Sequence, residues 1–293
     1  MKKLNSVDNH RINYEIHLLT ENGGEEAFNI LKNIAAFLKE NDHLLGYANG
    51  VTASLLNIYE IGLSNINPSE FGLIPERIFT PKPHFKILLN KESYQKTNTY
   101  LKANKISKTK LGNYNIEIKY DKRLDKTKHH KKYSFQSLSK LAVKENNEQS
   151  IFHVKDFNDY VDIFSINNAF GLQSYWFQEL SCNSYNSLAN SYSFLQTNNL
   201  FNVILFQEEW MTIIKKITDL SYFEINLFRK AVGRKIPIKK IERIIKTNLK
   251  EKFKISVRDY KQIYDTLMSC IHFLPCKAHI ASEAYIEIVT KND

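Results

Sequence analysis

Four cations near the C-terminal third of the chain have the types and spacing to bind phosphate. Two Arg-Lys pairs, Arg229-Lys230 and Arg234-Lys235, bracket the small residues Ala231-Val232-Gly233. Guanidinium and ammonium groups match the geometry and charge of phosphate oxygens. The tetrad (Arg229, Lys230, Arg234 and Lys235) therefore indicates a receptor for a nucleotide or nucleic acid. An ordinary basic helix surface is the alternative.

Other groups with chemical potential are less specific. The doublet His129-His130 lies in a charged tract without a cysteine or carboxylate at metal-ligand spacing, which favours a solvated loop. Asp156, Asp159 and Asp162 recur at a spacing that shares one helix face, and a solvated acidic face is favoured over a cation site. We assign no metal ligand.

The net charge of +10 is divided between two basic segments. Residues 91–144 hold 15 Lys/Arg against 4 Asp/Glu, and residues 229–254 hold 11 against 2. Segregated cations attract a polyanion such as DNA through counterion release. A lysine-rich solvated surface explains the first segment equally well.

Elements must position these side chains, and apolar periodicity predicts them. Helical spacing predicts amphipathic helices, and alternation or short apolar runs predict strands. The predicted helices span 25–40, 51–62 (buried), 238–253 and 257–273, with a further helix opened by Gln207-Glu208; the predicted strands span 85–89 and 114–120.

Composition places the chain among globular proteins of a reducing compartment. Apolar residues make up 43% of the chain, and the three cysteines are odd in number and distant from one another. The N-terminus lacks the apolar core of a signal peptide, and no apolar run is long enough to span a bilayer. We expect a cytoplasmic protein with no membrane partner.

Ordered motifs along the chain resemble the bacterial DNA polymerase III alpha subunit family. In the palm region of that family, the similar strings here are Arg11–Leu19, Gly46–Val51, Gly62–Pro68 and Pro75–Ile78. In the fingers region they are Gln207-Glu208, Leu227–Lys235 and Cys276-Lys277-Ala278-His279. The resemblance implies that the tetrad, Lys277 and His279 face nucleotide or DNA.

The resemblance fails at the catalytic carboxylates. His84 and Lys86 stand where the family has two aspartates, and Ser134 stands at the best match for the third. Nucleotidyl transfer relies on two Mg²⁺ ions, which need anionic oxygen ligands. These degenerate positions predict that polymerase chemistry is absent, so we assign no catalytic residue and expect no cofactor, with Mg²⁺ only if the chain is active.

The resemblance implies an α+β fold. We expect a polymerase-beta-like palm with a small mixed sheet over residues 1–170, including a shortened thumb insertion at about 90–131. An all-helical fingers-like domain should follow over residues 171–293. The expected function is that of an inactive DNA-binding paralogue in replication or repair, with DNA and replication or repair proteins as partners.

Two alternatives stay open. One is an active minimal polymerase with rewired metal ligands, which predicts carboxylates beside His84; Asp121 and Asp125 are available in sequence. The other is a protein-interaction module that does not bind DNA.

Overall fold

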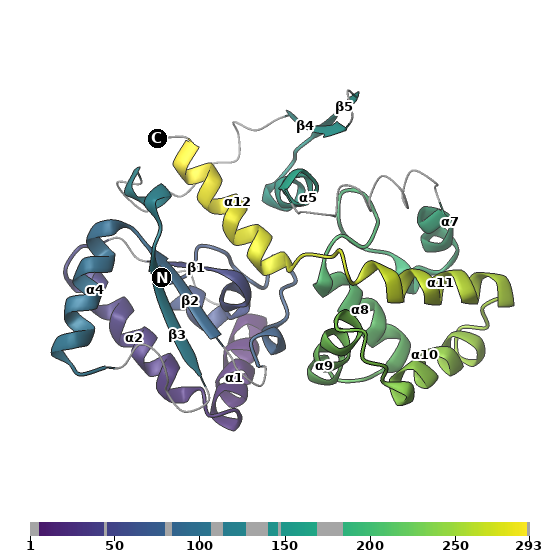
Figure 1. The fold of residues 1–293 in the computed structure, drawn as a ribbon, viewed down its shortest axis with the longest axis horizontal. Helices are drawn as coiled ribbons and strands as arrows, with labels where there is room; N and C mark the ends of the chain where they lie inside the picture. The colour runs from purple at the N-terminus through teal and green to yellow at the C-terminus, as the bar shows by residue number, and fades with distance from the viewer. Residues whose placement is uncertain are drawn as a thin grey trace. The chain divides into compact units, whose positions relative to one another are not determined.

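The chain forms two compact units. The computed structural model describes residues 6–43, 46–79, 84–106, 114–126, 140–145, 148–168 and 184–291. The N-terminal unit consists of Met1–Ser134 together with Ala278–Asp293, and the helical unit consists of Phe135–Lys277. In Figure 1 the N-terminal unit contains the purple-to-blue elements labelled α1, α2, α4 and β1–β3 and the yellow C-terminal helix α12.

A three-stranded mixed sheet lies at the centre of the N-terminal unit. Its order is β1 (Tyr47–Ala48), β2 (His84–Leu89), β3 (Asn115–Tyr120). β1 pairs antiparallel with β2, and β2 pairs parallel with β3. The parallel pair is joined through helix α4 (Lys91–Ala103), as parallel strands require a crossover connection. Both strands expected from the sequence are confirmed, each to within one residue.

Helices surround this sheet. They are α1 (Ser6–Glu21), α2 (Glu25–Glu40), α3 (Leu56–Glu60), α4 and α12 (Lys277–Lys291), with 3₁₀ turns at Gly50–Ser54, Pro75–Arg77 and Lys122–Lys126. The helix predicted at 25–40 is confirmed as α2. It buries the face formed by Ala27, Leu31, Ile34, Ala35 and Leu38.

The single helix predicted at 51–62 is wrong, because the backbone breaks at Leu55. That residue is extended, with φ −96° and ψ 122°, between a 3₁₀ turn and α3. The break is stabilised from outside the segment: the buried Glu15 carboxylate accepts the amides of Leu56 and Asn57 at 2.9 and 3.0 Å. A distant capping group therefore overrides local periodicity.

The helical unit contains one hairpin and a set of helices. The hairpin pairs β4 (Lys140–Glu145) antiparallel with β5 (Glu148–His153). The helices are α5 (Phe157–Asn168), α7 (Ser184–Ser191), α8 (Gln207–Thr218), α9 (Tyr222–Gly233), α10 (Lys239–Glu251) and α11 (Val257–Cys270), with a 3₁₀ turn at Ser193–Leu195. The helices predicted at 238–253 and 257–273 correspond to α10 and α11.

Trp210 is the centre of the helical unit's core. It is fully buried, its indole N–H donates to the Leu267 carbonyl at 2.6 Å, and its ring packs on Phe228 with centroids 5.8 Å apart. This single side chain ties α8 to α9 and α11.

The α+β fold class is confirmed, with a small mixed sheet in one unit and mainly helices in the other. The compact units divide near residue 134, with β4, β5 and α5 in the helical unit. Residues 90–131, where the resemblance implies a shortened thumb insertion, contain α4 and β3. β3 is a strand of the central sheet, and α4 connects it to β2. The assignment of palm-like and fingers-like domains stays a prediction. Among the described helices, none has the length and apolarity needed to cross a bilayer.

Candidate functional site

The start of β2 presents His84 and Lys86 beside a carboxylate of β3. The parallel register places Glu117 opposite Lys86, and His84 Nε2 lies 3.1 Å from Glu117 Oε2. Lys119 Nζ contacts the other oxygen of Glu117 at 2.6 Å. Burial alone would raise the pKa of Glu117. The hydrogen bond from Lys119 and the charges of His84 and Lys86 outweigh that burial, so the pKa is lowered.

A second ion-paired group adjoins the ends of these strands. Arg123 Nη2 contacts Asp121 Oδ2 at 2.6 Å, and its Nη1 contacts Glu283 Oε2 at 2.7 Å. Buried Asn49 donates to the remaining oxygen of Glu283 at 2.8 Å. Burial raises the pKa of Asp121, but the hydrogen bonds and charge of Arg123 hold it below its usual value. Both carboxylates are thus already engaged by cations or amides.

His279 adjoins this second ion-paired group. It lies on the part of α12 that packs in the N-terminal unit. Loss of water around the ring lowers the pKa of His279; Glu283 raises it, whereas Lys86 and Arg123 lower it further. The charge of Lys86 acts on Glu117, Asp121 and His279, whereas His84 joins this set through its contact with Glu117. We call this set the strand-end charge cluster; it comprises Asn49, His84, Lys86, Glu117, Lys119, Asp121, Arg123, His279 and Glu283.

The strand-end charge cluster is poorly suited to a divalent cation. A metal at Glu117 or Asp121 would have to displace Lys119 or Arg123 and approach the ammonium of Lys86. Among the described residues, no three His, Cys, Asp or Glu side chains are grouped so as to hold a metal ion. Ser134, the third degenerate position, and the doublet His129-His130 lie outside the described residues.

Sequence reasoning missed Glu117 and Glu283 for different reasons. Glu117 could have been found, because two parallel strands at 85–89 and 114–120 bring a β3 carboxylate beside Lys86. Glu283 could not, since its contact with Asn49 spans 234 residues of sequence.

The tetrad lies at the C-terminal end of α9. Ala231-Val232-Gly233 is the last turn of that helix, and the amides of Arg234, Lys235 and Ile236 donate to helix carbonyls at 2.8–3.2 Å. The backbone therefore offers no amide cradle for a phosphate at this turn. Any phosphate would be held by side chains alone, against the negative end of the helix dipole.

The four cations of the tetrad differ in exposure. Arg234 and Lys235 are exposed, and Lys230 is half-buried. Arg229 is half-buried, and its guanidinium donates to Asn226 Oδ1 at 3.1 and 3.2 Å. Lys230 and Arg234, four residues apart, share one helix face.

Lys277 lies at the same end of the α8–α9 hairpin as the tetrad. The Trp210–Phe228 contact places the start of α8 beside the last turns of α9. The amide of Lys277 donates to Glu208 at 2.8 Å, and its ammonium lies 5.3 Å from the centre of the Phe206 ring. Five of the six predicted binding residues therefore occupy one end of the helical unit.

The Gln207-Glu208 pair fixes the segment before α12. Gln207 donates to the carbonyl of Leu274 at 2.7 Å, while buried Glu208 accepts from the amide of Lys277 and the thiol of Cys276. The pair is thus structural, and it positions Lys277.

Asp162 corrects the prediction of a solvated acidic face. Asp156 is exposed at the start of α5, but Asp162 is buried and accepts the Leu200 amide at 2.9 Å. Burial raises the pKa of Asp162 to about 7, opposed by the Leu200 amide and the charge of Lys277. α5 packs this carboxylate inward because the helix is apolar on several sides.

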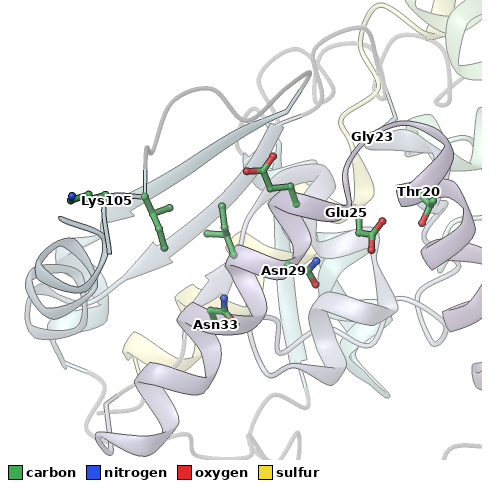
Figure 2. Close-up of a pocket in the computed structure, with 9 residues that line it drawn as sticks. Thr20, Gly23, Glu25, Asn29, Asn33 and Lys105 are labelled. Carbon is green, nitrogen blue, oxygen red and sulfur yellow. The ribbon is translucent and has the colours of Figure 1, made fainter. Parts of the chain in front are cut away.

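A shallow groove of about 740 Å³ lies elsewhere in the N-terminal unit. Figure 2 shows its lining: Glu25, Asn29 and Asn33 follow one another along α2, with Thr20 and Lys105 on neighbouring segments. Its lining combines amides, carboxylates and an ammonium without a nucleophile–base pair, and it includes no residue of the strand-end charge cluster.

Comparisons with known proteins agree with the palm motifs. Residues 1–84 match the family model described as the bacterial DNA polymerase III alpha NTPase domain. DNA polymerase III subunit alpha of Staphylococcus aureus strains Mu50 and N315 is 33% identical over 72 residues, which is 25% of this chain and 7% of the relative. The corresponding Staphylococcus epidermidis protein is 29% identical over the same length. The matched region thus spans only a small part of the curated relatives.

The matched motifs have structural roles in this chain. Arg11 Nε pairs with buried Glu15 at 2.9 Å, and its Nη2 donates to the carbonyls of Ser54 and Leu73. Glu76, buried in the Pro75–Arg77 turn, accepts from Tyr14 at 2.7 Å. These contacts join the motifs to one another within one unit. The N-terminal part of this chain is therefore similar to the bacterial DNA polymerase III alpha family.

Proposed function

We propose that this chain is a DNA polymerase III alpha-like protein that binds DNA without catalysing nucleotidyl transfer. We place it in the cytoplasm, in replication or repair, with proteins of those processes as further partners. The observation that supports the loss of chemistry is that β2 carries His84 and Lys86 at the positions where the resemblance implies two aspartates.

The surroundings of β2 support this proposal. A polymerase palm uses anionic oxygens to hold two cations at this place. Here Lys86, Lys119 and Arg123 supply fixed positive charge, and they engage or lie near the carboxylates that remain. Because Lys119 and Arg123 already neutralise the carboxylates of Glu117 and Asp121, these carboxylates should have a low affinity for Mg²⁺.

Basic side chains at one end of the helical unit support the proposal that the chain binds nucleic acid. Arg234 and Lys235 are exposed, and Lys277 lies at the same end of the α8–α9 hairpin. Side-chain cations at an exposed end suit contacts to a phosphodiester backbone, which need no amide cradle. The role of His279 in binding DNA stays a prediction, and within the N-terminal unit this side chain lies in the strand-end charge cluster.

A primer-extension assay tests the missing chemistry. The purified chain, given a primed template, all four deoxynucleotides and Mg²⁺ or Mn²⁺, should leave the primer unextended. Extension that is abolished by Glu117→Gln or Asp121→Asn would instead establish the active polymerase with rewired ligands. Extension that is insensitive to both changes would point to a contaminating enzyme.

A binding assay tests the DNA surface. Arg234→Gln with Lys235→Gln should weaken binding to a labelled duplex and reduce the slope of log K against log salt by about 1.8, since each duplex phosphate contact contributes about 0.9. Lys32→Gln with Lys39→Gln is the charge-matched control on α2, outside both basic segments, and it should leave the slope unchanged. Salt-insensitive or absent binding would favour the protein-interaction module.

A further inference from the structure

Helix α10 carries a single cationic stripe that the tetrad does not include. Lys239, Arg243, Lys246 and Lys250 are exposed and follow one another at spacings of four, three and four residues. Such spacing places them along one side of a helix. The other side buries Ile245 and Leu249 in the core, so the stripe is held facing away from it.

Two tyrosines of α11 line the edge of this stripe. Tyr260 and Tyr264 are half-buried, with ring centroids 6.3 Å apart and ring planes 24° from parallel. Lys250 Nζ lies 4.7 Å from the centre of the Tyr260 ring, and Lys246 Nζ lies 4.7 Å from that of Tyr264. Two cations and two aromatic rings therefore form a ladder across two packed helices.

We propose that this tyrosine–lysine ladder (Lys246, Lys250, Tyr260 and Tyr264) binds single-stranded nucleic acid. Bases stack on the two tyrosine rings, and the two lysines turn from the rings to adjacent phosphates. The inference rests on the proposed function, that the chain binds nucleic acid, and assigns a strand type and a second surface to it.

Replacement of a lysine by a base as the partner of each tyrosine ring is favourable. A lysine over an exposed ring strengthens an interaction by only about two- to fivefold. A base stacked on an aromatic side chain strengthens binding by about five- to 150-fold. Moreover, the displaced lysine keeps a counter-charge, because its ammonium pairs with a phosphate.

The ladder suits a single strand better than a duplex. The bases of a duplex are stacked on one another and offer no free face to a tyrosine, whereas an unpaired base does. Acidic groups also border the rings, since Glu242 and Asp265 both act on the Tyr264 hydroxyl. These carboxylates repel a duplex, which carries two phosphate backbones, more than they repel a single strand, which carries one.

Fluorescence anisotropy with the full chain tests the stacking. The probes are a labelled oligothymidine of about 16 nucleotides and a duplex of equal length. Tyr260→Leu with Tyr264→Leu should weaken oligothymidine binding about 25-fold or more, from at least about fivefold per ring, with little change for the duplex. Tyr260→Phe with Tyr264→Phe keeps both rings and should bind as the unaltered chain does.

The salt dependence tests the lysines separately. Lys246→Gln with Lys250→Gln should reduce the slope of log K against log salt for oligothymidine by about 1.4, at about 0.7 per phosphate of a single strand. The tyrosine variants should keep the slope. The control Lys155→Gln with Lys216→Gln removes two exposed lysines of the same unit that lie off the ladder and outside the basic segments, and its slope should not fall.

The outcomes separate this inference from the proposed function. Full oligothymidine affinity in the Tyr→Leu variant, with binding lost in the Arg234/Lys235 variant, overturns the ladder and leaves DNA binding standing. Absence of binding to either probe at about 50 mM salt overturns both. Photocrosslinking of iodouracil-labelled oligonucleotide to the unaltered chain keeps the test valid if the Leu variant misfolds. Crosslinks at Tyr260 or Tyr264 support the ladder, and crosslinks confined to other residues reject it.

Discussion

One buried carboxyl group, that of Asp162, makes the stability of this protein depend on pH. Asp162 is 1% exposed, and among the described groups its Oδ1 has no hydrogen-bond partner. Burial is the largest cause that raises its pKa, which reaches about 7. The folded state therefore favours the protonated carboxyl, whereas the unfolded chain ionises near pH 4.

The sign of the resulting pH dependence is fixed. The pKa of Asp162 is higher in the folded state than in the unfolded chain. Its contribution to the free energy of unfolding therefore falls as pH rises from about 4 to about 7, by roughly 4 kcal/mol in total. Asp162→Asn should remove this part of the slope in urea unfolding measured between pH 5 and 8, and should stabilise the protein at pH 8. Asp156→Asn, at an exposed position, is the control. Equal slopes in the unaltered chain and the Asp162→Asn variant would contradict the assignment.

Glu15 illustrates a buried charge that is fully paired. It receives Arg11, the amides of Leu56 and Asn57, and the Asn57 side chain at 2.9–3.0 Å. Glu15→Ala should lower the free energy of unfolding by about 3–5 kcal/mol, because it leaves the Arg11 charge and two amides without their acceptor. Glu21→Gln, at an exposed position on the same helix, should cost far less in the same urea titration. Similar losses in both variants would show that the Glu15 network is not important for stability.

At the scale of elements, close packing decides which small residues are required. A Cβ on Gly46 would lie 2.3 Å from Ile87 Cγ2 and 2.9 Å from Leu89 Cδ2, whereas one on Gly233 would meet no atom within 4 Å. Gly46 therefore permits the approach of β1 to β2, and Gly233 simply ends α9.

The two glycines give a matched pair of variants. Gly46→Ala should reduce stability by about 1–3 kcal/mol through overpacking. Gly233→Ala should be neutral or stabilising by up to about 1 kcal/mol, since alanine is the better helix former. Thermal unfolding followed by circular dichroism measures both, and a destabilised Gly233→Ala variant would show that the end of α9 is more constrained than its free space indicates.

Local patterns predicted the strands β2 and β3 and the helices α2, α8, α10 and α11 for a physical reason. The faces of α2 and α10 are set by residues three and four apart, so periodicity within the helix suffices. The segment 51–62 failed because the carboxylate of Glu15, some forty residues earlier, caps a new helix at Leu56. Such a contact leaves no trace in the segment's own pattern.

At the scale of the whole molecule, the C-terminal helix completes the N-terminal unit. Ile286 is fully buried in a cluster with Tyr47, Leu88 and Leu124, and Glu283 binds Asn49. The first unit is therefore discontinuous in sequence, whereas the helical unit is formed from one continuous segment.

Truncation of the chain after Lys277 tests this arrangement. Loss of Ile286 and Glu283 should destabilise the N-terminal unit, and amide hydrogen exchange should accelerate in β1, β2 and β3. Exchange in α8–α11 should stay nearly unchanged, because the Glu208–Lys277 contact is retained. Uniform acceleration across both units would show that they unfold as one, and no acceleration in the sheet would show that α12 is dispensable.

The likeness to a known family is also uneven over the molecule. The family-model match covers residues 1–84. Within this range Arg11 pairs with Glu15, and Tyr14 donates to Glu76, so these contacts connect segments of the N-terminal unit. The fingers-like motifs lie beyond that match, so their resemblance stays a prediction. Glu208 and Gln207 have a clear structural role without it.

The sequence by itself determined the features that are local. It predicted β2, β3 and the helices α2, α8, α10 and α11, because residue identity and short-range spacing suffice for these elements. Only the tertiary structure decided how the charges are shared. It paired Glu117 and Glu283 with their partners, brought His279 under the influence of Lys86 and Arg123, and buried Asp162. These outcomes depend on contacts between side chains of different strands and helices, separated by as many as 234 residues of sequence. Burial and charge pairing shift a pKa only where such distant segments pack together.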